Sequence, residues 1–360
     1  MHRVGIPVHV YKDTTLRVKI HDACGLTCTF CHNEGTPVAI DNRHRSPGEF
    51  VTSGGSGRAS IYAATNGAAF LPAPMPDDEE FARAIAVLRD ALELNELHFT
   101  GGEPTSHPSV ARLTKIAVDT GYRVAMTSNG ERGERVIPEC AAAGLHRINF
   151  SIFGTTAAEL AEVQHARYRN PVLAQRKIDA LECSIAACET HGVKPCANIV
   201  VPDYSHAPRV HRLLDEYSPH LSVRLLNSLD DIATSMAANE RILADRGAVP
   251  EAHYTTAGVS GTSTAYRLPE GRRVYFKQFR MVRMPDTCTG CRFNNDTDCK
   301  EGFYGVRLYY DRVSGFQVGV CIQRMDLCLP LAEFVASPLR REILALRNDE
   351  YQRLATRQAG

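Results

Sequence analysis

Short apolar runs alternate with amphipathic stretches over the first two thirds of the chain. Residues 16–20 alternate apolar and polar side chains, which predicts a strand. Five later runs predict further strands at 96–100, 123–127, 147–152, 195–201 and 221–226. Helical spacing predicts helices over 77–94, 109–119, 136–143, 171–191 and 209–217. This alternation indicates right-handed βαβ units and a parallel sheet, hence an α/β fold whose six strands form a partial barrel.

Polar and glycine-rich turns follow the predicted strands. Gly101-Gly-Glu-Pro104 follows the strand at 96–100, Ser128-Asn-Gly130 follows the next, and Gly154 follows the strand at 147–152. Since the carboxyl ends of parallel strands meet at one edge of a sheet, we expect these turns to gather on one face and to form the site there.

The pattern changes after residue 227. Residues 228–250 have helical spacing, residues 273–280 predict a strand, and residues 305–321 predict a β-hairpin around the turn Asp311 to Gly315. We therefore expect a partial barrel over 1–227 and a small cysteine-rich accessory domain containing a β-hairpin over 228–360.

One long segment, residues 33–75, has little periodicity. It includes the glycine-rich stretch 53–57, which suggests flexibility. Long loops inside compact domains are often functional, so we interpret this segment as a mobile loop flanking the site.

Net charge and hydropathy disfavour two classes of protein, nucleic-acid-binding proteins and membrane-spanning proteins. The 360 residues include 41 basic and 41 acidic side chains, giving a formal net charge of zero. Proteins that bind nucleic acid through its phosphates are usually more basic, so that class is disfavoured. The sequence shows no apolar run long enough for a membrane span and no secretory signal at its start, which favours the cytoplasm.

Twelve cysteines fall into three sets along the chain. The middle set lies on helical or strand patterns, and its members are expected to be buried small hydrophobic residues: Cys140, Cys183, Cys188 and Cys196. The first and last sets are closely spaced clusters, which in a reducing compartment suggest metal or iron–sulfur ligands.

The first cluster is Cys24, Cys28 and Cys31, on the loop after the first predicted strand. Three thiolates on one loop can hold three irons of a [4Fe–4S] cluster, leaving the fourth iron for a small molecule to chelate. The alternative is a structural zinc site, for which His21 or His32 would supply the fourth ligand.

Two further features favour the cluster. Phe30 directly precedes the last cysteine, and Gly101-Gly-Glu-Pro104 follows the next long strand. Together with the cysteine spacing, they resemble the signature of the radical S-adenosylmethionine (SAM) superfamily. The resemblance implies that Phe30 lies by the adenine of SAM and that Gly101, Gly102 and Glu103 bind its methionine amino group. It also implies that Ser128, Asn129 and Ser151 contact the carboxylate and ribose.

The resemblance also implies a chemistry. An electron donor such as flavodoxin or ferredoxin would reduce the cluster, SAM would be cleaved, and the resulting 5′-deoxyadenosyl radical would abstract hydrogen from a small-molecule substrate. The cofactors supply this chemistry, while the protein positions the substrate.

The last cysteine set predicts a second [4Fe–4S] cluster held by Cys288, Cys291, Cys299 and Cys321, with Cys328 as the alternative fourth ligand. The layout resembles the GTP cyclases of molybdenum cofactor biosynthesis over residues 14–330. This chain departs from them in its terminal residues and in Cys299, which would close the cluster so that it relays electrons without binding substrate. A structural zinc site is the alternative.

Three functions are compatible with these observations. We favour hydrogen abstraction from a small polar metabolite (a sugar, nucleoside or nucleotide) for oxidation or rearrangement in cofactor or natural-product biosynthesis. A peptide-modifying enzyme is disfavoured because only about fifteen residues precede the first strand, too few for a peptide-clamping domain. The third is a non-catalytic zinc or iron–sulfur module. Candidate substrate contacts are Lys277, Arg280, Arg283, His165, Arg167, Arg169, Tyr304 and Arg307.

Overall fold

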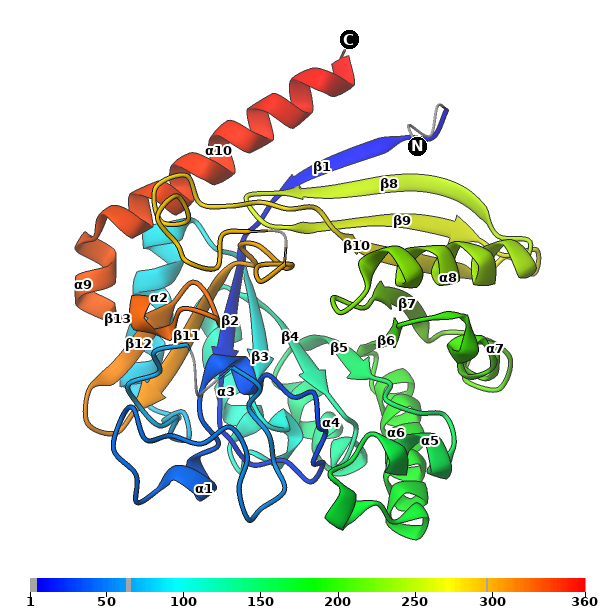
Figure 1. Ribbon diagram of the computed structural model, residues 1–360, viewed down its shortest axis with the longest axis horizontal. Coiled ribbons are helices and arrows are strands. Elements are labelled where there is room, and N and C mark those ends of the chain that lie inside the picture. The colour runs from blue at the N-terminus through cyan, green and yellow to red at the C-terminus, as the bar shows by residue number, and fades with distance from the viewer. Residues whose placement is uncertain (1–4, 63–65, 296, 360) are drawn as a thin grey trace. The chain divides into compact units, whose positions relative to one another are not determined.

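The computed structural model describes residues 5–62, 66–295 and 297–359. The chain folds into two compact units. The larger unit comprises Thr14–Pro195 and Gly305–Ala336, and the smaller unit comprises Met1–Asp13, Cys196–Tyr304 and Ser337–Gly360. Each unit combines strands and helices, so the predicted α/β class is confirmed (Figure 1). The predicted boundary at residue 227 stays a prediction.

The larger unit contains seven strands in the order β5-β4-β3-β2-β11-β12-β13. Neighbours from β5 to β11 run parallel, whereas β12 and β13 are antiparallel to the strands beside them. The bounds are β2 (Thr15–Lys19), β3 (Glu96–Thr100), β4 (Arg123–Ser128), β5 (Leu145–Ser151), β11 (Val306–Asp311), β12 (Gly315–Gly319) and β13 (Leu329–Pro330).

The register of the parallel strands places apolar side chains together on one face of the sheet and polar side chains together on the other. Val18 pairs with Phe99 and Phe99 with Met126, and all three side chains are fully buried. Because side chains alternate along a strand, the opposite face carries polar groups. On that face, Thr127 Oγ1 lies 2.9 Å and Asn149 Nδ2 3.2 Å from His98 Nε2. The sheet therefore has one apolar core face and one face lined by polar side chains.

Helices follow the strands as the pattern predicts. The larger unit contains α1 (Ala39–Asn42), α2 (Glu79–Leu92), α3 (Val110–Asp119), α4 (Gly133–Ala142), α5 (Ala157–Glu162), α6 (Pro171–Thr190) and α9 (Leu331–Ala336). Asp78 caps α2 by accepting hydrogen bonds from the backbone N–H groups of Glu80 and Phe81. Asn170 caps α6 in the same way, with Pro171 at its first position. Local sequence thus starts both helices.

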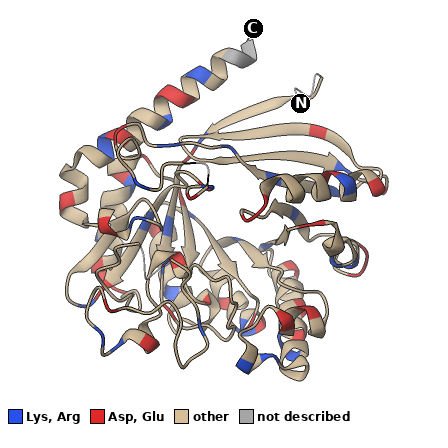
Figure 2. Ribbon diagram, in the orientation of Figure 1, with Lys and Arg blue, Asp and Glu red and all other residues tan. Residues whose placement is uncertain are grey.

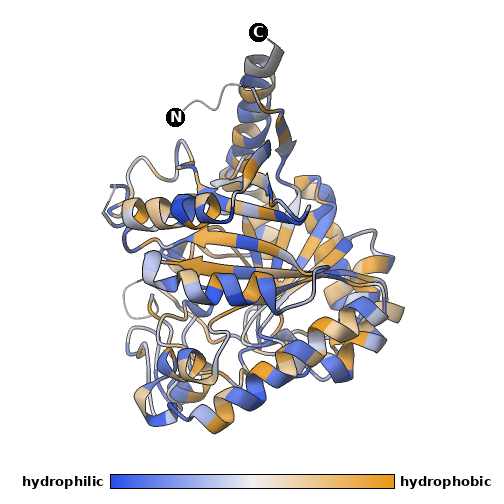
Figure 3. Ribbon diagram, turned by 90° about the vertical axis from the view of Figure 1, so that its right-hand side faces the viewer, coloured by the Kyte–Doolittle hydropathy of each residue, from blue (hydrophilic) through white to orange (hydrophobic). Residues whose placement is uncertain are grey.

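The smaller unit contains β1 (Val8–Lys12), β6 (Lys194–Val201), β7 (Ser222–Asn227), β8 (Val249–Ala257), β9 (Gly261–Arg267) and β10 (Arg273–Phe279). Its strand order is β1-β8-β9-β10-β7-β6, in which β6, β7 and β10 run parallel and β9 is antiparallel to both its neighbours. Its helices are α7 (Ala207–Asp215), α8 (Ile232–Asp245) and α10 (Pro338–Ala359). Figure 3 shows apolar stretches in several strands and helices banded with both polar and apolar residues.

The structure confirms all six predicted strands and corrects the interpretation of 228–250. α8 ends at Asp245, and β8 begins at Val249 and pairs with β9, a hairpin that the sequence pattern did not predict. Its strands mix Thr, Ser, His and Tyr on both faces, so the period-2 signal is weak. The predicted hairpin at 305–321 is confirmed as β11 and β12.

The aperiodic segment 33–75 packs closely in its described part, 33–62 and 66–75. A Cβ on Gly57 would lie 2.3 Å from Tyr168 Cε2, and one on Gly54 would lie 2.6 Å from Asp41 Cγ. The backbone N–H of Ile61 donates to the carbonyl oxygen of Cys31. The glycines that suggested flexibility therefore permit close packing beside the cysteine loop.

Three of the four middle cysteines are buried, as predicted: Cys140, Cys188 and Cys196. The prediction for Cys183 was wrong, because this side chain is exposed on α6. Cys188, five residues later, falls on the buried side of that helix, since a five-residue step on a 3.6-residue period turns the side chain well away.

Several helices carry charged residues of both signs. In Figure 2 basic and acidic residues intersperse along the helices, and α6 carries both signs. Within the described residues, no helix is both long and apolar enough to cross a bilayer.

Candidate functional site

The candidate site lies at the carboxyl ends of β2, β3, β4 and β5 in the larger unit. The loop after β2 carries Cys24, Cys28 and Cys31, and the turn after β3 carries Gly101, Gly102 and Glu103. Ser128 ends β4 and Asn129 follows it, while Ser151 ends β5. The parallel topology brings these residues to one edge of the sheet, as the sequence predicted.

The two glycines fix the turn after β3 against the start of the cysteine loop. Gly102 N–H donates to the carbonyl of His21 at 2.9 Å, and Glu103 N–H donates to the carbonyl of Ala23 at 2.7 Å. A Cβ on Gly102 would lie 2.1 Å from the Ala23 oxygen, and one on Gly101 would lie 2.5 Å from the His21 oxygen. Only glycine fits this close approach of two backbones.

Glu103 joins the turn after β3 to the end of β4. Its Oε1 accepts from Thr105 N–H at 2.9 Å and from Ser128 Oγ at 2.7 Å, and its Oε2 accepts from Asn129 N–H at 2.5 Å. Burial raises the pKa of Glu103, while these donors favour the ionised form. Oε2 accepts only this hydrogen bond among those described, which leaves acceptor capacity for the ammonium group predicted from the sequence.

The cysteine loop is held from two further sides. Asn129 Nδ2 donates to Cys24 Sγ at 3.5 Å, and Glu131 Oε2 accepts from Gly25 N–H at 2.9 Å. On the other side, His165 N–H donates to the carbonyl of Thr27 at 2.9 Å. The segment around His165 therefore lies beside the cysteine loop.

The three thiols are partly or fully buried and close enough to influence one another. Burial raises the pKa of the Cys24 thiol to about 12. Burial, and then the neighbouring Cys31 and Cys24, also raise the pKa of Cys28. Within the described ranges, no group of three or more His, Cys, Asp or Glu side chains forms a ready metal-binding cluster.

The donor chemistry of the loop fits an iron–sulfur cluster. It presents three thiols, which as thiolates are the preferred ligands of such clusters, and bound cations would offset the burial that holds the thiols of Cys24 and Cys28 protonated. His21, one candidate fourth ligand for zinc, is engaged elsewhere, since its Nε2 lies 2.7 Å from the carbonyl oxygen of Glu103. Burial lowers the pKa of His21, so a neutral ring donates this hydrogen bond. His32 Nδ1 likewise accepts from Glu34 N–H at 3.0 Å.

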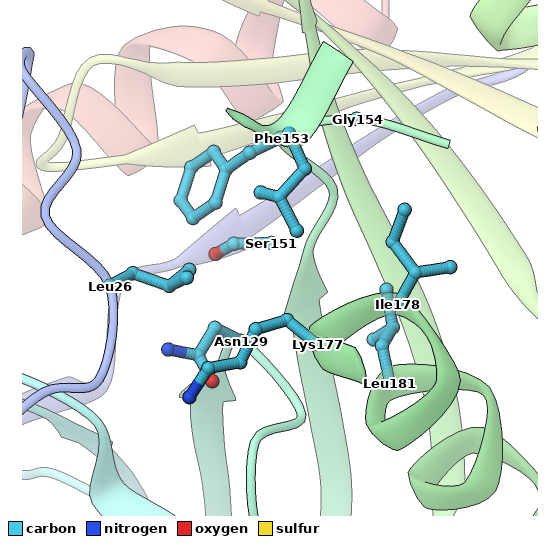
Figure 4. A pocket seen from close by; sticks show the side chains of 9 residues that line it. Leu26, Asn129, Ser151, Phe153, Gly154, Lys177, Ile178 and Leu181 are labelled. Carbon is cyan, nitrogen blue, oxygen red and sulfur yellow. The ribbon is translucent and has the colours of Figure 1, made fainter. Parts of the chain in front are cut away.

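A pocket adjoins the loop, and Figure 4 shows Asn129, Ser151 and Lys177 lining it. It is a small cleft that is partly open to solvent. Phe30 is 46% exposed, and its ring centroid lies 5.3 Å from that of Phe153, which also lines the pocket. Two predicted cofactor residues, Asn129 and Ser151, thus line one cavity, and Phe30 contacts Phe153 of its lining.

Sequence reasoning missed several residues of this site. Lys177 lines the pocket from α6 and pairs with Glu131, while Gln164 contacts the cysteine loop. Each lies more than a hundred residues from the cysteines along the chain, in a segment whose pattern indicates only a helix or a turn. The Phe30–Phe153 pair had one available signal, because Phe153 follows a predicted strand end.

A buried charged group supports the loop from the other side. Lys19 Nζ donates to Asp22 Oδ1 at 3.1 Å, and Arg58 pairs with the same carboxylate at 3.5 Å. Burial opposes ionisation of Asp22, but Lys19 and Arg58 outweigh it and hold its pKa below the usual value. Burial lowers the pKa of Lys19, an effect that the Asp22 carboxylate opposes.

Two candidate substrate contacts, Arg280 and Arg307, form ion pairs within the protein. Arg307 is buried and donates from Nε to Glu34 Oε2 at 2.9 Å, and Arg280 pairs with Glu350. Each of these arginines thus pairs with a carboxylate of its own unit, and a contact with substrate stays a prediction. Lys277 Nζ contacts Tyr304 Oη, and Arg283 Nη2 donates to the carbonyl of Asn295 at 3.4 Å.

The last cysteines divide between the units. Cys288, Cys291 and Cys299 lie in the smaller unit and Cys321 and Cys328 in the larger one. Cys291 N–H donates to the carbonyl of Cys288, Met284 N–H donates to Cys288 Sγ at 3.3 Å, and burial raises the pKa of Cys288. Such N–H···S contacts in a C-x2-C turn suit a metal-bound thiolate. Cys321 as the fourth ligand stays a prediction.

The fold and this cysteine site define a class of protein. Residues 18–187 match the model of the Radical SAM superfamily, which covers the cysteine loop and the turns after β3, β4 and β5. The chain therefore carries a radical SAM domain, and a domain of this class implies a [4Fe–4S] cluster and SAM.

Among curated proteins, the chain is 28% identical over 142 residues to the GTP 3′,8-cyclase of Streptomyces coelicolor. That match covers 39% of this chain and 33% of the relative. It is 26% identical over 150 residues to the probable GTP 3′,8-cyclase of Thermococcus kodakarensis, covering 42% of this chain and 36% of the relative. The chain thus spans about a third of the length of these relatives. The crystal structure of SuiB from Streptococcus suis superposes with a TM-score of 0.41 at 15% identity, covering 68% of this chain and 50% of that one.

Proposed function

We propose that this protein is a radical SAM enzyme that cleaves SAM reductively and abstracts hydrogen from a small polar metabolite. The observation that carries the proposal is the convergence of the three cysteines with Gly102, Glu103, Asn129 and Ser151 at one sheet edge. The similarity to GTP 3′,8-cyclases supports a sugar, nucleoside or nucleotide as substrate and a role in cofactor or natural-product biosynthesis.

Cys24, Cys28 and Cys31 would hold three irons of the cluster. When bound, the cluster and SAM supply a 5′-deoxyadenosyl radical, after one electron from a donor such as flavodoxin or ferredoxin breaks the sulfonium C–S bond. We place this chemistry in the cytoplasm, where thiols stay reduced.

The chain's own residues orient the cofactor. The free capacity of Glu103 Oε2 would accept the methionine ammonium beside the backbone of Gly101 and Gly102. Ser151 and Asn129 would donate to the carboxylate and ribose from the pocket wall. The exposed face of Phe30, backed by Phe153, would cover the adenine.

The test is an anaerobic reconstitution with iron and sulfide, followed by reduction in the presence of SAM. We expect 5′-deoxyadenosine to form, and we expect Cys28→Ala to abolish its formation because one iron ligand is lost. Cys183→Ala is the matched control, since this cysteine is exposed on α6. A fully reconstituted wild-type protein that releases no 5′-deoxyadenosine would contradict the proposal.

We further propose that Cys288, Cys291, Cys299 and Cys321 bind a second [4Fe–4S] cluster. The mutual proximity of Cys288, Cys291 and Cys299 within the smaller unit supports this, since each neighbouring thiol raises the pKa of Cys288 after the effect of burial. Four thiolates would leave no iron open to substrate, so such a cluster would transfer electrons.

A further inference from the structure

Gln164 is a buried side chain that neither the sequence motifs nor the proposed cofactor contacts account for. It follows α5, is only 6% exposed, and lies across from Cys28 in an isolated antiparallel bridge. An uncharged polar side chain buried this deeply is expected to have its hydrogen bonds satisfied, so its partners indicate its role.

The hydrogen-bond partners fix the orientation of the Gln164 amide. Its oxygen receives the backbone N–H of Thr27 at 2.6 Å and Thr27 Oγ1 at 3.3 Å. A backbone N–H is only a donor, so the atom facing it must be the oxygen. The amide nitrogen therefore faces the other way, where it donates to the carbonyl of Leu160 at 3.3 Å and to Cys28 Sγ at 3.8 Å.

This arrangement gives Gln164 two physical effects on the cysteine loop. Its oxygen holds the backbone at Thr27, one residue before Cys28, and its nitrogen directs an N–H dipole at the Cys28 sulfur. In a buried site such a dipole acts strongly because little water screens it. Hydrogen bonds to cluster sulfurs stabilise the more negatively charged, reduced state and thereby raise the reduction potential.

We infer that Gln164 is a positioning residue that holds the Cys28 ligand and raises the reduction potential of the cluster bound by Cys24, Cys28 and Cys31. The inference rests on the proposed function, because it requires that these cysteines hold a cluster. Asn129 makes the corresponding contact to Cys24 at 3.5 Å, but it also lines the pocket and is expected to touch SAM. Gln164 does not line that pocket, so its effect on the cluster is separable from cofactor binding.

The experiment is an anaerobic redox titration of the reconstituted protein, followed by electron paramagnetic resonance of the reduced cluster, without SAM. Gln164→Met has nearly the same shape but neither donor nor acceptor. Gln164→Glu keeps an oxygen for Thr27 N–H but loses the donor to sulfur. We expect both variants to have a more negative midpoint potential than the wild type, with the larger shift in Gln164→Glu because it adds a negative charge.

Gln175→Glu is the matched control, because it makes the same chemical change at an exposed position on α6, where the side-chain amide donates to Asp179. We expect its midpoint potential to equal that of the wild type. An equal shift in Gln175→Glu and Gln164→Glu would overturn the inference, since it would show a general charge effect. Unchanged potentials in the Gln164 variants that retain the cluster would also overturn it.

The two proposals fail in different ways. If wild-type protein binds no reducible cluster, the proposed function fails before Gln164 is tested. If wild type holds the cluster and Gln164→Glu keeps its iron with an unchanged potential, only the role of Gln164 is refuted. Should Gln164→Met lose its iron, Gln164→Glu decides the outcome, because its remaining oxygen still holds Thr27.

Discussion

At the residue scale, backbone proximity explains the glycines more directly than ligand contact does. The sequence motif assigned Gly101 and Gly102 to cofactor binding. In the structure, both positions must also be glycine because a Cβ would collide with a neighbouring backbone. Both lie against the backbone of residues 21–23, immediately before Cys24. The turn after β3 therefore positions Cys24, the first proposed cluster ligand, whether or not SAM is bound.

Gly102→Ala tests this packing. Its Cβ would lie 2.1 Å from a backbone oxygen, so the two loops would have to separate. We expect a loss of about 3 kcal/mol in the free energy of unfolding and a lower iron content after reconstitution. Gly55→Ala is the control, because no atom lies within 4 Å of its added Cβ. Equal stability of the two variants in urea denaturation would contradict the packing argument.

His107 gives a prediction about pH. It is 4% exposed, and burial, followed by the proximity of His21, lowers its pKa from 6.5 to about 4. Between these values the unfolded chain binds a proton that the folded chain does not, so stability is full above pH 6.5 and falls toward pH 4. The loss is on the order of 2 kcal/mol.

The variant His107→Asn keeps an acceptor near the Ser109 N–H but cannot titrate. We expect its unfolding free energy to change less than that of wild type between about pH 7 and pH 5. The exposed His191 provides the control variant His191→Asn, whose pH profile should follow wild type. A His107→Asn profile as steep as that of wild type would show that other groups dominate.

At the element scale, α6 organises the loop that follows β4. Ser184 Oγ donates to the carbonyl of Gly130 at 2.7 Å, and a Cβ on Gly130 would lie 2.8 Å from Leu181 Cα. Lys177 on the same helix pairs with Glu131, whose other oxygen receives Gly25 N–H of the cysteine loop. One helix thus connects the pocket wall with the loop that presents the proposed cluster ligands.

Lys177→Met tests this connection. It removes a cation from the pocket wall and leaves Glu131 without its ion-pair partner, so we expect SAM to bind roughly tenfold more weakly. Arg176→Met is the matched control, because Arg176 is the preceding, exposed residue of α6. Equilibrium dialysis with labelled SAM measures both, and equal affinities would refute a role for Lys177.

Strands with a clear pattern of apolar side chains could be predicted from the sequence, and strands without one could not. The strands β2 to β5 are fully buried on one face, and their apolar patterns made them recognisable. By contrast, β8 and β9 carry polar side chains on half-exposed positions, and nothing local distinguishes them from loop. Their pairing is decided by neighbouring strands, which a single segment does not contain.

At the scale of the whole molecule, the last cysteines come from segments far apart in sequence and from both compact units. If Cys299 ligates a second cluster, Cys299→Ala should retain basal SAM cleavage but lose product formation. Iron content should fall from about eight toward about four per chain. Cys183→Ala should keep both values, and unchanged iron and turnover in Cys299→Ala would remove Cys299 from the ligand set.

The sequence by itself determined the α/β class, the positions of the six central strands along the chain and the cysteine loop. These depend on short-range patterns, namely alternation, helical spacing and residues within one turn. Only the tertiary structure decided that Glu103 joins two strand ends, that Arg280 and Arg307 are neutralised internally, and that Gln164 faces Cys28. The physical reason is that each contact joins side chains distant in sequence, and their distances and burial are set by packing.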